Sequence, residues 1–282
     1  EFAERIPGWC VIVGPIGTGQ EVHAGEQAGL VQRRRAVERC GDPSAWTVHA
    51  PADIEPHFVG ADLSTQWEPS LNLDTELRFH GARSLHDWVE ALLHAETHAD
   101  LDRAARLGEQ LWAAGYRMLV TRALDAAKRY ARERFDGAPL ARYGLLASSK
   151  AKDLPRWGVD NSFRATVQRV GPWYNAPPDD SRSCCQFRDV ATEFSTQGLE
   201  LDLAVLAWGS DLLVEDGRWS ARRSGRANFV TDTLGLRRNV YRVLLTRGRE
   251  GTVLFVPEGG EYEEACRRLG RAGARGLERS GL

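Results

Sequence analysis

Four short, almost entirely apolar runs between residues 117 and 257 constrain the fold of this chain most strongly. The runs cover residues 117–121, 143–147, 202–208 and 252–257. A strand that is apolar on both faces is typical of a parallel sheet covered by helices on both sides. Between the runs, residues 124–135 and 236–245 carry apolar side chains at helical spacing. The succession of strand, helix and strand predicts an α/β fold with a parallel sheet and crossover helices.

The first third of the chain predicts less regular structure. Residues 9–13 (Trp-Cys-Val-Ile-Val) predict a short buried strand, and residues 57–59 favour another. Prolines interrupt residues 14–70, which we expect to be rich in loops. A longer helix is predicted from Ser84 to about Ala114, with Ser84 as its N-cap.

Composition excludes several classes of protein. Hydrophobic residues make up 42% of the chain and charged residues 27%, with a net charge of −2, which excludes a disordered or fibrous protein. No apolar run approaches the roughly 18 residues of a membrane-spanning helix. The five cysteines are odd in number and irregularly spaced, so we expect no disulfide framework and a cytoplasmic location.

The basic residues are unevenly distributed. Only three of the 37 are lysines (Lys128, Lys150 and Lys152), so 37 − 3 = 34 are arginines. Residues 217–249 contain nine arginines and a single acid, Asp232. The local balance of 9 − 1 = +8 indicates a phosphate-bearing partner, with a solvated basic face as the alternative.

A glycine-rich loop follows the first predicted strand. Its sequence, Gly14-Pro-Ile-Gly-Thr-Gly19-Gln20-Glu21, has the glycine spacing of a P-loop. A P-loop needs a lysine and then a serine or threonine where Gln20 and Glu21 stand, and a carboxylate there repels a triphosphate. We therefore reject the P-loop interpretation. Gln20 remains a candidate phosphate or water contact at the end of a strand, with a flexible turn as the alternative.

Two segments carry the most specific patterns. Residues 190–202 place Thr192 and Glu200 ahead of a buried strand. In residues 236–249 the apolar helical face leaves Arg247 at the end of the predicted helix, free to project toward a ligand. The first pattern thus predicts Thr192 and Glu200 near an edge of the sheet.

These segments resemble motifs V and VI of superfamily 1 helicases, in the form found in the Schlafen-type DNA/RNA helicase group (domain of unknown function 2075). Residues 19–26 resemble motif III of that group, and Leu77-Arg78-Phe79 with the helix that follows resembles motif IV. Further segments that fit the pattern are residues 120–122, 143–151, 173–174 and 183–185. The resemblance runs through nearly the whole chain in order.

The resemblance implies a motor of two RecA-like domains, with ATP and Mg²⁺ between them and DNA or RNA across the top. It assigns residues 1–70 to the tail of the first domain and 71–282 to the second. The implied nucleotide-binding residues are Gln20, Arg78, Gln197, Gly198, Glu200 and Arg247. Among these, Gln20 senses the γ-phosphate, while Arg78 and Arg247 approach it as catalytic arginines. The implied contacts to the nucleic-acid backbone are Thr121, Arg122, Thr192 and Ser195.

The chain departs from the group in having neither Walker A nor Walker B, so it supplies half of a nucleotide site. We expect a Walker-bearing domain, in the same gene or on a partner chain, to supply the other half, and no membrane partner. The predicted function is the C-terminal half of an ATP-dependent DNA/RNA helicase or translocase. The alternative is a non-catalytic nucleic-acid-binding or regulatory module that lacks the ATPase half. For Arg78 and Arg247 themselves, the alternative to a role at the nucleotide is a surface salt bridge.

One histidine pair tests the metal hypothesis. His94 and His98 are one helical turn apart, but Ala95 stands where a zinc protease has its glutamate. The sequence therefore favours a solvated helix face over a metal site at this pair.

Overall fold

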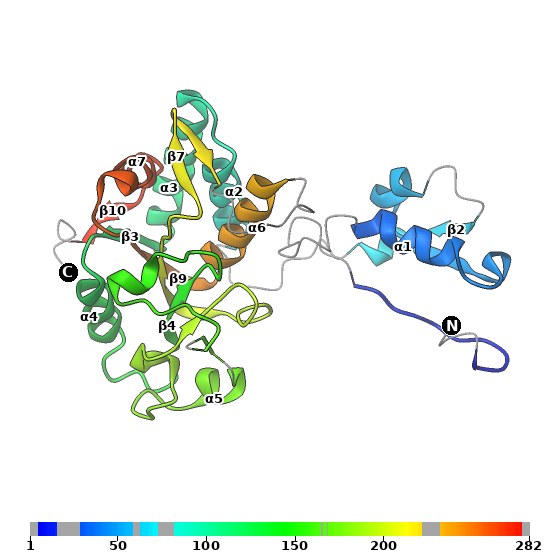
Figure 1. The fold of residues 1–282 in the computed structure, drawn as a ribbon, viewed down its shortest axis with the longest axis horizontal. Coiled ribbons are helices and arrows are strands. Elements are labelled where there is room, and N and C mark those ends of the chain that lie inside the picture. Colours follow the sequence, from blue (N-terminus) through cyan, green and yellow to red (C-terminus); the bar gives the residue numbers. More distant parts are fainter. Residues whose placement is uncertain are drawn as a thin grey trace. The chain divides into compact units, whose positions relative to one another are not determined.

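A computed structural model describes most of the chain, which divides into two compact units, Glu1–Leu77 and Arg78–Leu282. Figure 1 shows each unit as a ribbon. The described residues are 5–15, 29–58, 63–72, 82–164, 166–167, 169–221 and 232–277. Gln20 and Arg78, which the resemblance places at the nucleotide, lie outside them.

The larger unit is built on a six-stranded sheet in which every pair of neighbouring strands is parallel. The spatial order is β10-β3-β9-β6-β4-β5. The strands are β3 (Arg117–Thr121), β4 (Tyr143–Ala147), β5 (Val190–Ala191), β6 (Leu201–Ala207), β9 (Gly248–Phe255) and β10 (Arg275–Gly276). The predicted α/β class with a parallel sheet is confirmed, and the sheet is compatible with a RecA-like fold.

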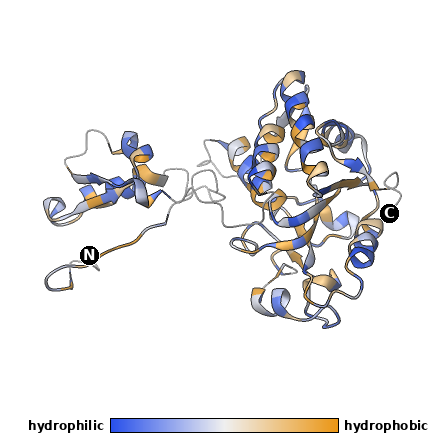
Figure 2. Cartoon of the chain, turned by 180° about the vertical axis from the view of Figure 1, so that it is seen from behind, coloured by the Kyte–Doolittle hydropathy of each residue, from blue (hydrophilic) through white to orange (hydrophobic). Residues whose placement is uncertain are grey.

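Helices cover both faces of this sheet. They are α2 (Ala82–Leu93), α3 (His98–Ala113), α4 (Leu124–Arg134), α5 (Val170–Asn175), α6 (Thr233–Leu245) and α7 (Gly260–Arg271). Helices α4 and α5 lie on one side of the sheet, and α2, α3, α6 and α7 lie on the other (Figure 1). Every residue of β4 and β6 is therefore buried, as the apolar runs predict. Figure 2 shows the hydrophobic residues concentrated in the strands and on the helix sides that face them.

The predicted bounds agree closely with the structure in the sheet and less well before it. The runs at residues 117–121 and 143–147 are β3 and β4 without change, and β6 begins one residue earlier than predicted. The single helix predicted from Ser84 is wrong, because two helices occupy its span and Ser84 lies inside the first. Thr97 starts the second helix by accepting a hydrogen bond from the Asp100 amide, while the Asp100 carboxylate accepts one from the Thr97 amide.

A short antiparallel hairpin is added beyond the carboxyl end of β6. It consists of β7 (Leu213–Glu215) and β8 (Arg218–Ser220). Its two turn residues, Asp216 and Gly217, both have positive φ, at 49° and 74°. This is the backbone that a two-residue hairpin requires and that an Asp-Gly pair supplies readily.

The smaller unit has little core. It contains α1 (Gly29–Glu38) and the parallel pair β1 (Thr47–Ala50) and β2 (Ser64–Trp67), and three 3₁₀ turns. The turns cover Pro43–Ala45, Ala52–His57 and Pro69–Leu71. Among its described residues, the buried apolar side chains are Leu30, Ala50 and Phe58.

Both strands predicted in this unit are wrong. Residues 9–13 form no strand, and Trp9 and Val13 are 82% and 81% exposed. A strand is stabilised by its hydrogen-bonded neighbours, and no strand pairs with residues 9–13 in the described part of this unit. His57 ends a 3₁₀ turn, Phe58 follows it, and the third residue of that prediction, Val59, lies outside the described residues.

Candidate functional site

Arg247 lies at the amino end of β9, directly after α6, and is 3% exposed. Its Nε donates to the carbonyl oxygen of Val243 at 2.8 Å, and its Nη1 donates to that of Leu199 at 2.9 Å. The expectation that Arg247 projects freely from the helix end is therefore wrong. The alternative of a surface salt bridge does not describe it either, because the side chain is buried and its guanidinium donates to backbone carbonyl groups of α6 and of the segment before β6.

The contact with Leu199 brings Arg247 beside the other nucleotide candidates of the larger unit. Gly198 has a φ of 77°, and a side chain there would meet no atom within 4 Å. Gln197 is exposed and Glu200 is half-buried. The hydroxyl of Tyr174 donates to the carbonyl oxygen of Glu200 at 2.8 Å. The structure thus brings together four of the residues that the resemblance assigns to the nucleotide, at the amino ends of β6 and β9: Gln197, Gly198, Glu200 and Arg247. Their contact with a nucleotide stays a prediction.

Sequence reasoning missed an ionic cluster at the same end of the sheet. Asp202 accepts a hydrogen bond from the Arg142 amide at 2.6 Å and forms an ion pair with Arg249. The hydrogen bond from Arg249 to Asp202 is the main reason that the pKa of this arginine is raised. The side chain of Arg249 is 46% exposed and that of Asp202 is 9% exposed, so the ion pair joins a buried carboxylate to a half-exposed arginine. The two residues are 47 positions apart in the chain, so no local spacing pointed to them.

The predicted nucleic-acid contacts lie at the opposite, carboxyl ends of the strands. Thr121 ends β3 and is 2% exposed, and its hydroxyl accepts a hydrogen bond from the Ala123 amide at 3.1 Å. Thr192 follows β5 and is 5% exposed, and the Ser195 hydroxyl accepts from its amide at 2.9 Å. These positions share one edge of the sheet, and their contact with nucleic acid stays a prediction.

Arg122 is held within the protein at this edge. Its Nη1 donates to the carbonyl oxygen of Pro257 at 2.5 Å, and its Nη2 pairs with Glu263 at 2.7 Å. The side chain thus joins β3 to the connection between β9 and α7. A nucleic-acid phosphate would have to compete with Glu263 for this guanidinium.

A buried polar network that the sequence did not predict lies at the carboxyl ends of β4 and β6. Asp211 accepts from the hydroxyls of Ser148 at 2.6 Å and Tyr241 at 2.9 Å, and Arg237 Nε lies 3.4 Å from the same carboxylate. Asp211 is 3% exposed, and burial raises the pKa of its carboxyl group. Ser148 directly follows β4 and Tyr241 lies in α6. The network therefore ties the segment after β6, which contains Asp211, to β4 and α6 at the carboxyl edge of the sheet.

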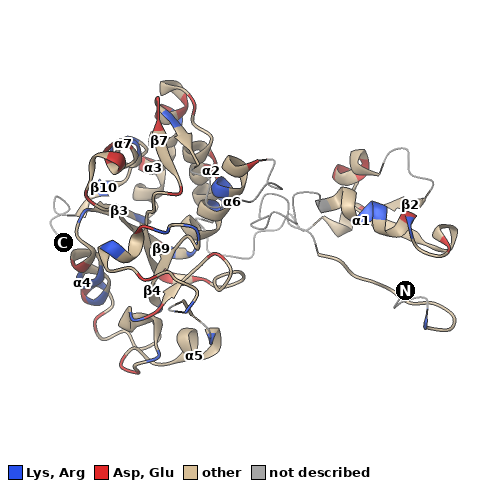
Figure 3. Ribbon diagram, viewed as in Figure 1, with Lys and Arg blue, Asp and Glu red and all other residues tan. Residues whose placement is uncertain are grey.

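In the described part of the basic segment at residues 217–249, several arginines are paired within the fold. Arg237 lies against Asp211, Arg242 pairs with Glu90 at 2.6 Å, and Arg249 pairs with Asp202. Figure 3 shows the basic positions of α6 close to the body of the larger unit. Arg237, Arg242 and Arg249 thus have partners within the fold, and the phosphate-bearing partner that the charge excess indicates stays a prediction.

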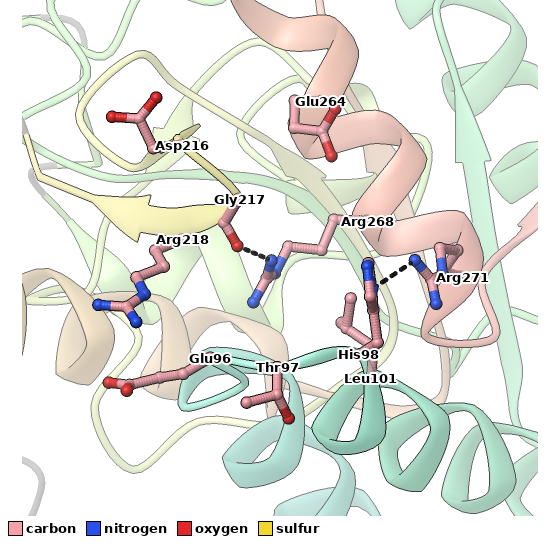
Figure 4. Close-up of a pocket in the computed structure, with 10 residues that line it drawn as sticks. All are labelled: Glu96, Thr97, His98, Leu101, Asp216, Gly217, Arg218, Glu264, Arg268 and Arg271. Atoms are coloured by element: carbon pink, nitrogen blue, oxygen red, sulfur yellow. Dashed lines mark hydrogen bonds between the residues drawn. The ribbon is translucent and has the colours of Figure 1, made fainter.

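A pocket of about 430 Å³ lies between the start of α3, the β7–β8 turn and α7. Arg268 donates to the carbonyl oxygens of Gly217, at 2.8 Å, and Ala95, and Arg271 lies 3.0 Å from His98 Nδ1 (Figure 4). Three acidic and three arginine side chains line it: Glu96, Asp216, Glu264, Arg218, Arg268 and Arg271. None of the predicted site residues that the structure describes lines this pocket, and the charges of its lining side chains balance.

No group of metal-ligating side chains stands out in the described residues. No cluster of three or more histidine, cysteine or acidic side chains there is arranged to hold a metal ion. His94 Nδ1 lies 2.7 Å from Glu90, and His98 contacts Arg271. Each histidine of the predicted helical pair thus has its own protein partner.

Within the described parts of the chain, no helix is both long and apolar enough to cross a membrane.

Comparison with known proteins gives one match of wide coverage. The family model of the Schlafen group 3 DNA/RNA helicase domain matches residues 3–258. Searches of the curated proteins and of the solved structures gave no significant match. The family match spans both the Gly198–Glu200 segment and Arg247, together with all four predicted nucleic-acid contacts. The chain belongs to the Schlafen group 3 DNA/RNA helicase domain family.

Proposed function

We propose that this chain is the C-terminal half of an ATP-dependent DNA or RNA helicase or translocase, with its larger unit acting as the second RecA-like domain. The observation that carries the proposal is the separation of the two candidate sets within one parallel sheet. Gly198, Glu200 and Arg247 gather at the amino edge, and Thr121 and Thr192 lie at the carboxyl edge. A nucleotide and a nucleic-acid strand can then be bound at once, on different edges.

The described residues contain no cluster of three or more histidine, cysteine or acidic side chains that could hold Mg²⁺, and the glycine-rich loop has Gln20 where a P-loop has the lysine that binds the triphosphate. A Walker A/B-bearing domain, in the same gene or on a partner chain, supplies those groups in this proposal. Bound ATP supplies the free energy for movement along the strand. Gln20 and Arg78 are assigned to this nucleotide from their motifs alone.

The structure favours a more specific role for Arg247. Its guanidinium holds the Leu199 carbonyl, which lies between Gly198 and Glu200. Arg247 is therefore proposed to hold the nucleotide-facing backbone of this segment in place, in addition to carrying positive charge toward the nucleotide. Glu200 is proposed to face the sugar, and the open space around Gly198 allows a ligand to approach the backbone closely.

The first test is nucleic-acid binding by the chain alone. Fluorescence anisotropy with fluorescein-labelled oligo-dT and oligo-rU should show binding at low salt that weakens steeply as salt rises and varies little with sequence. A chain that binds neither probe at low salt contradicts the proposal.

The second test is ATP hydrolysis with and without a Walker A/B-bearing domain. The chain alone should show no measurable turnover, whereas the combined protein should hydrolyse ATP and lose turnover on Glu200→Gln. Robust Mg²⁺-dependent turnover by the chain alone, lost on Arg247→Ala, would contradict the half-site assignment. Nucleic-acid binding without any turnover in the combined protein would support the regulatory alternative instead.

A further inference from the structure

Two adjacent cysteines, Cys184 and Cys185, begin a short 3₁₀ turn that packs against β4. The turn covers Cys184–Gln186 and is called the dithiol turn below. The hydroxyl of Ser183 accepts a hydrogen bond from the Cys185 amide at 3.4 Å. Both cysteines are 1% exposed, and their sulfur atoms lie 4.0 Å apart, within hydrogen-bond distance. The proposed contacts to nucleotide and nucleic acid do not include this pair.

The dithiol turn has little freedom on the side that faces β4. A Cβ atom added to Gly144 would lie 3.1 Å from Cys184 Cβ and 3.0 Å from the ring of Trp173, which is closer than ordinary contacts. The Cys185 thiol donates to the carbonyl oxygen of Ala141, just before β4, at 3.6 Å. Packing on β4 therefore holds the two sulfur atoms side by side.

The hydrogen bond between the two thiols makes them chemically different. The bond from Cys184 lowers the pKa of Cys185 against the opposing effect of burial, and the same bond raises the pKa of Cys184. The positive charge of Arg142 favours the thiolate form of both residues. Cys185 therefore ionises first, while Cys184 keeps its proton. A thiolate with a second thiol within reach is the arrangement of redox-active cysteine pairs.

A bond between these sulfur atoms would be easy to break again. The Cα atoms of consecutive residues are about 3.8 Å apart across a trans peptide bond, whereas disulfide-bonded cysteines usually have Cα atoms roughly 4.4–6.8 Å apart. A disulfide between adjacent residues is therefore strained, and strained disulfides are the labile and regulatory ones. Within the described residues the pair belongs to no metal-ligating group of three, so a metal site does not account for it.

We propose that Cys184 and Cys185 form a reversible oxidation site that reacts with a hydroperoxide to give a disulfide between the two residues. The Cys185 thiolate attacks one oxygen of hydrogen peroxide, the O–O bond breaks, and the hydroxide that leaves takes up a proton to become water. Cys184 then loses its proton and attacks the sulfur of the Cys185 sulfenic acid. The S–S bond forms and a second water leaves, so two thiols are oxidised and one peroxide is reduced. A thiol reductant reverses the reaction.

Closure of the ring should loosen the dithiol turn from β4. The oxidised Cys185 has no thiol proton to donate to the Ala141 carbonyl, and both sulfur atoms must move to reach the bonding distance of about 2.0 Å. A ring between adjacent residues restricts the unfolded chain very little, so it offers no compensating stabilisation. The oxidised protein should therefore melt at a lower temperature than the reduced one. This property is independent of ATP hydrolysis and of nucleic-acid binding.

The first experiment uses the unaltered full chain. The chain is treated with hydrogen peroxide, unfolded in urea with N-ethylmaleimide and analysed by peptide mass spectrometry. The peptide that contains Cys184 and Cys185 should carry no label and be two hydrogens lighter, and dithiothreitol should restore the label. Cys266 on α7, which has no adjacent cysteine in the chain, should still be labelled. A pair that stays labelled, or that ends as a sulfinic acid on one cysteine, overturns the proposal.

Substitutions test the division of roles between the two thiols. Cys184→Ser should stop at the sulfenic acid of Cys185, which dimedone traps. Cys185→Ser should react roughly tenfold more slowly or less, because burial keeps the remaining Cys184 protonated. Cys266→Ser is the matched control and should form the disulfide at the wild-type rate. Equal trapping by dimedone in both variants of the pair contradicts the assignment of Cys185 as the nucleophile.

Thermal unfolding followed by circular dichroism measures the effect of the disulfide on the fold. The melting temperature of the wild type should fall after peroxide treatment and return after dithiothreitol. An unchanged melting temperature of the fully oxidised protein contradicts the loosening of the dithiol turn. The wild-type experiments need no substitution, so they decide the proposal even if a variant of the buried pair fails to fold.

Discussion

The two edges of the parallel sheet use charge in opposite ways. At the amino edge, the arginine side chain of Arg247 binds backbone carbonyl oxygens, and Arg249 is paired with Asp202. At the carboxyl edge, the carboxylates of Glu193 and Asp211 bind amide and hydroxyl groups, and the ammonium group of the exposed Lys150 has no partner among the described residues. A motif arginine is thus fixed within the fold, while a lysine outside the helix-end motif stays at the surface.

Removing the buried carboxylate of the carboxyl edge should have the largest effect. Asp211→Ala leaves the hydroxyls of Ser148 and Tyr241 and the guanidinium of Arg237 without their acceptor. We expect the free energy of unfolding to fall by about 3–5 kcal/mol, measured by urea denaturation. The exposed Asp160→Ala is the control and should shift the urea midpoint far less. Equal shifts would show that the network does not hold this edge.

The same carboxylate predicts a pH dependence. Because burial raises the pKa of Asp211 in the folded state, the protonated form is favoured by folding. Its contribution to stability is therefore complete below the ordinary aspartate pKa of about 3.9 and falls as pH rises through the raised folded value. The free energy of unfolding of Asp211→Asn, measured against pH by urea denaturation, should lack this fall. A variant curve parallel to that of the wild type would refute the assignment.

The second largest effect should come from the amino edge. Arg247→Ala leaves the carbonyl groups of Leu199 and Val243 without a donor in a buried place. We expect a loss of about 2–4 kcal/mol in the free energy of unfolding. Arg267→Ala removes an exposed ion pair with Glu264 and should cost at most about 1 kcal/mol. If Arg247 were a freely projecting arginine, the two substitutions would cost equally little.

A smaller effect is expected from a change that keeps the shape of the Glu193 side chain. Glu193→Gln replaces one acceptor oxygen by a donor that faces the amide or hydroxyl of Ser149. We expect a loss of about 1–3 kcal/mol in thermal or urea unfolding. The exposed Glu133→Gln on α4 should have almost no effect. If Glu193→Gln unfolds at the same urea concentration and temperature as the wild type, then Glu193 does not hold the turn at residues 148–151.

The smallest effect on stability should be that of Lys150→Gln. Its ammonium group has no partner among the described residues, so the free energy of unfolding should change by no more than about 0.5 kcal/mol. The urea midpoint measures this directly. A large loss of stability would show that Lys150 stabilises the folded protein. The two edges of the sheet would then not differ in how their basic side chains are used.

Much of the sheet could be predicted from the sequence, because burial on both faces leaves a continuous apolar run. Strands β3 and β4 have the predicted bounds for this reason. The same reasoning failed at residues 9–13, since an apolar run predicts a strand only where another strand pairs with it. The break before α3 was readable in principle, because Thr97 and Asp100 have the spacing of a capping box.

The candidate site was predictable in position but not in chemistry. Helical periodicity placed Arg247 correctly at the end of α6, but the direction of a side chain beyond a helix end is not set by that periodicity. Its partner carbonyl belongs to Leu199, 48 residues earlier, and the Ser148 partner of Asp211 is 63 residues earlier. Contacts of this range depend on which strands become neighbours, and the apolar runs do not encode that order.

The outer strands of the sheet are much shorter than those inside it. Strands β5 and β10 have two residues each, whereas β9 has eight. An outer strand exposes unpaired amide and carbonyl groups that a foreign strand can use to join the sheet, and a two-residue strand offers very few of them. Few backbone groups of the outer strands are therefore available to pair with another copy of the larger unit, even though its inner strands consist mostly of apolar residues.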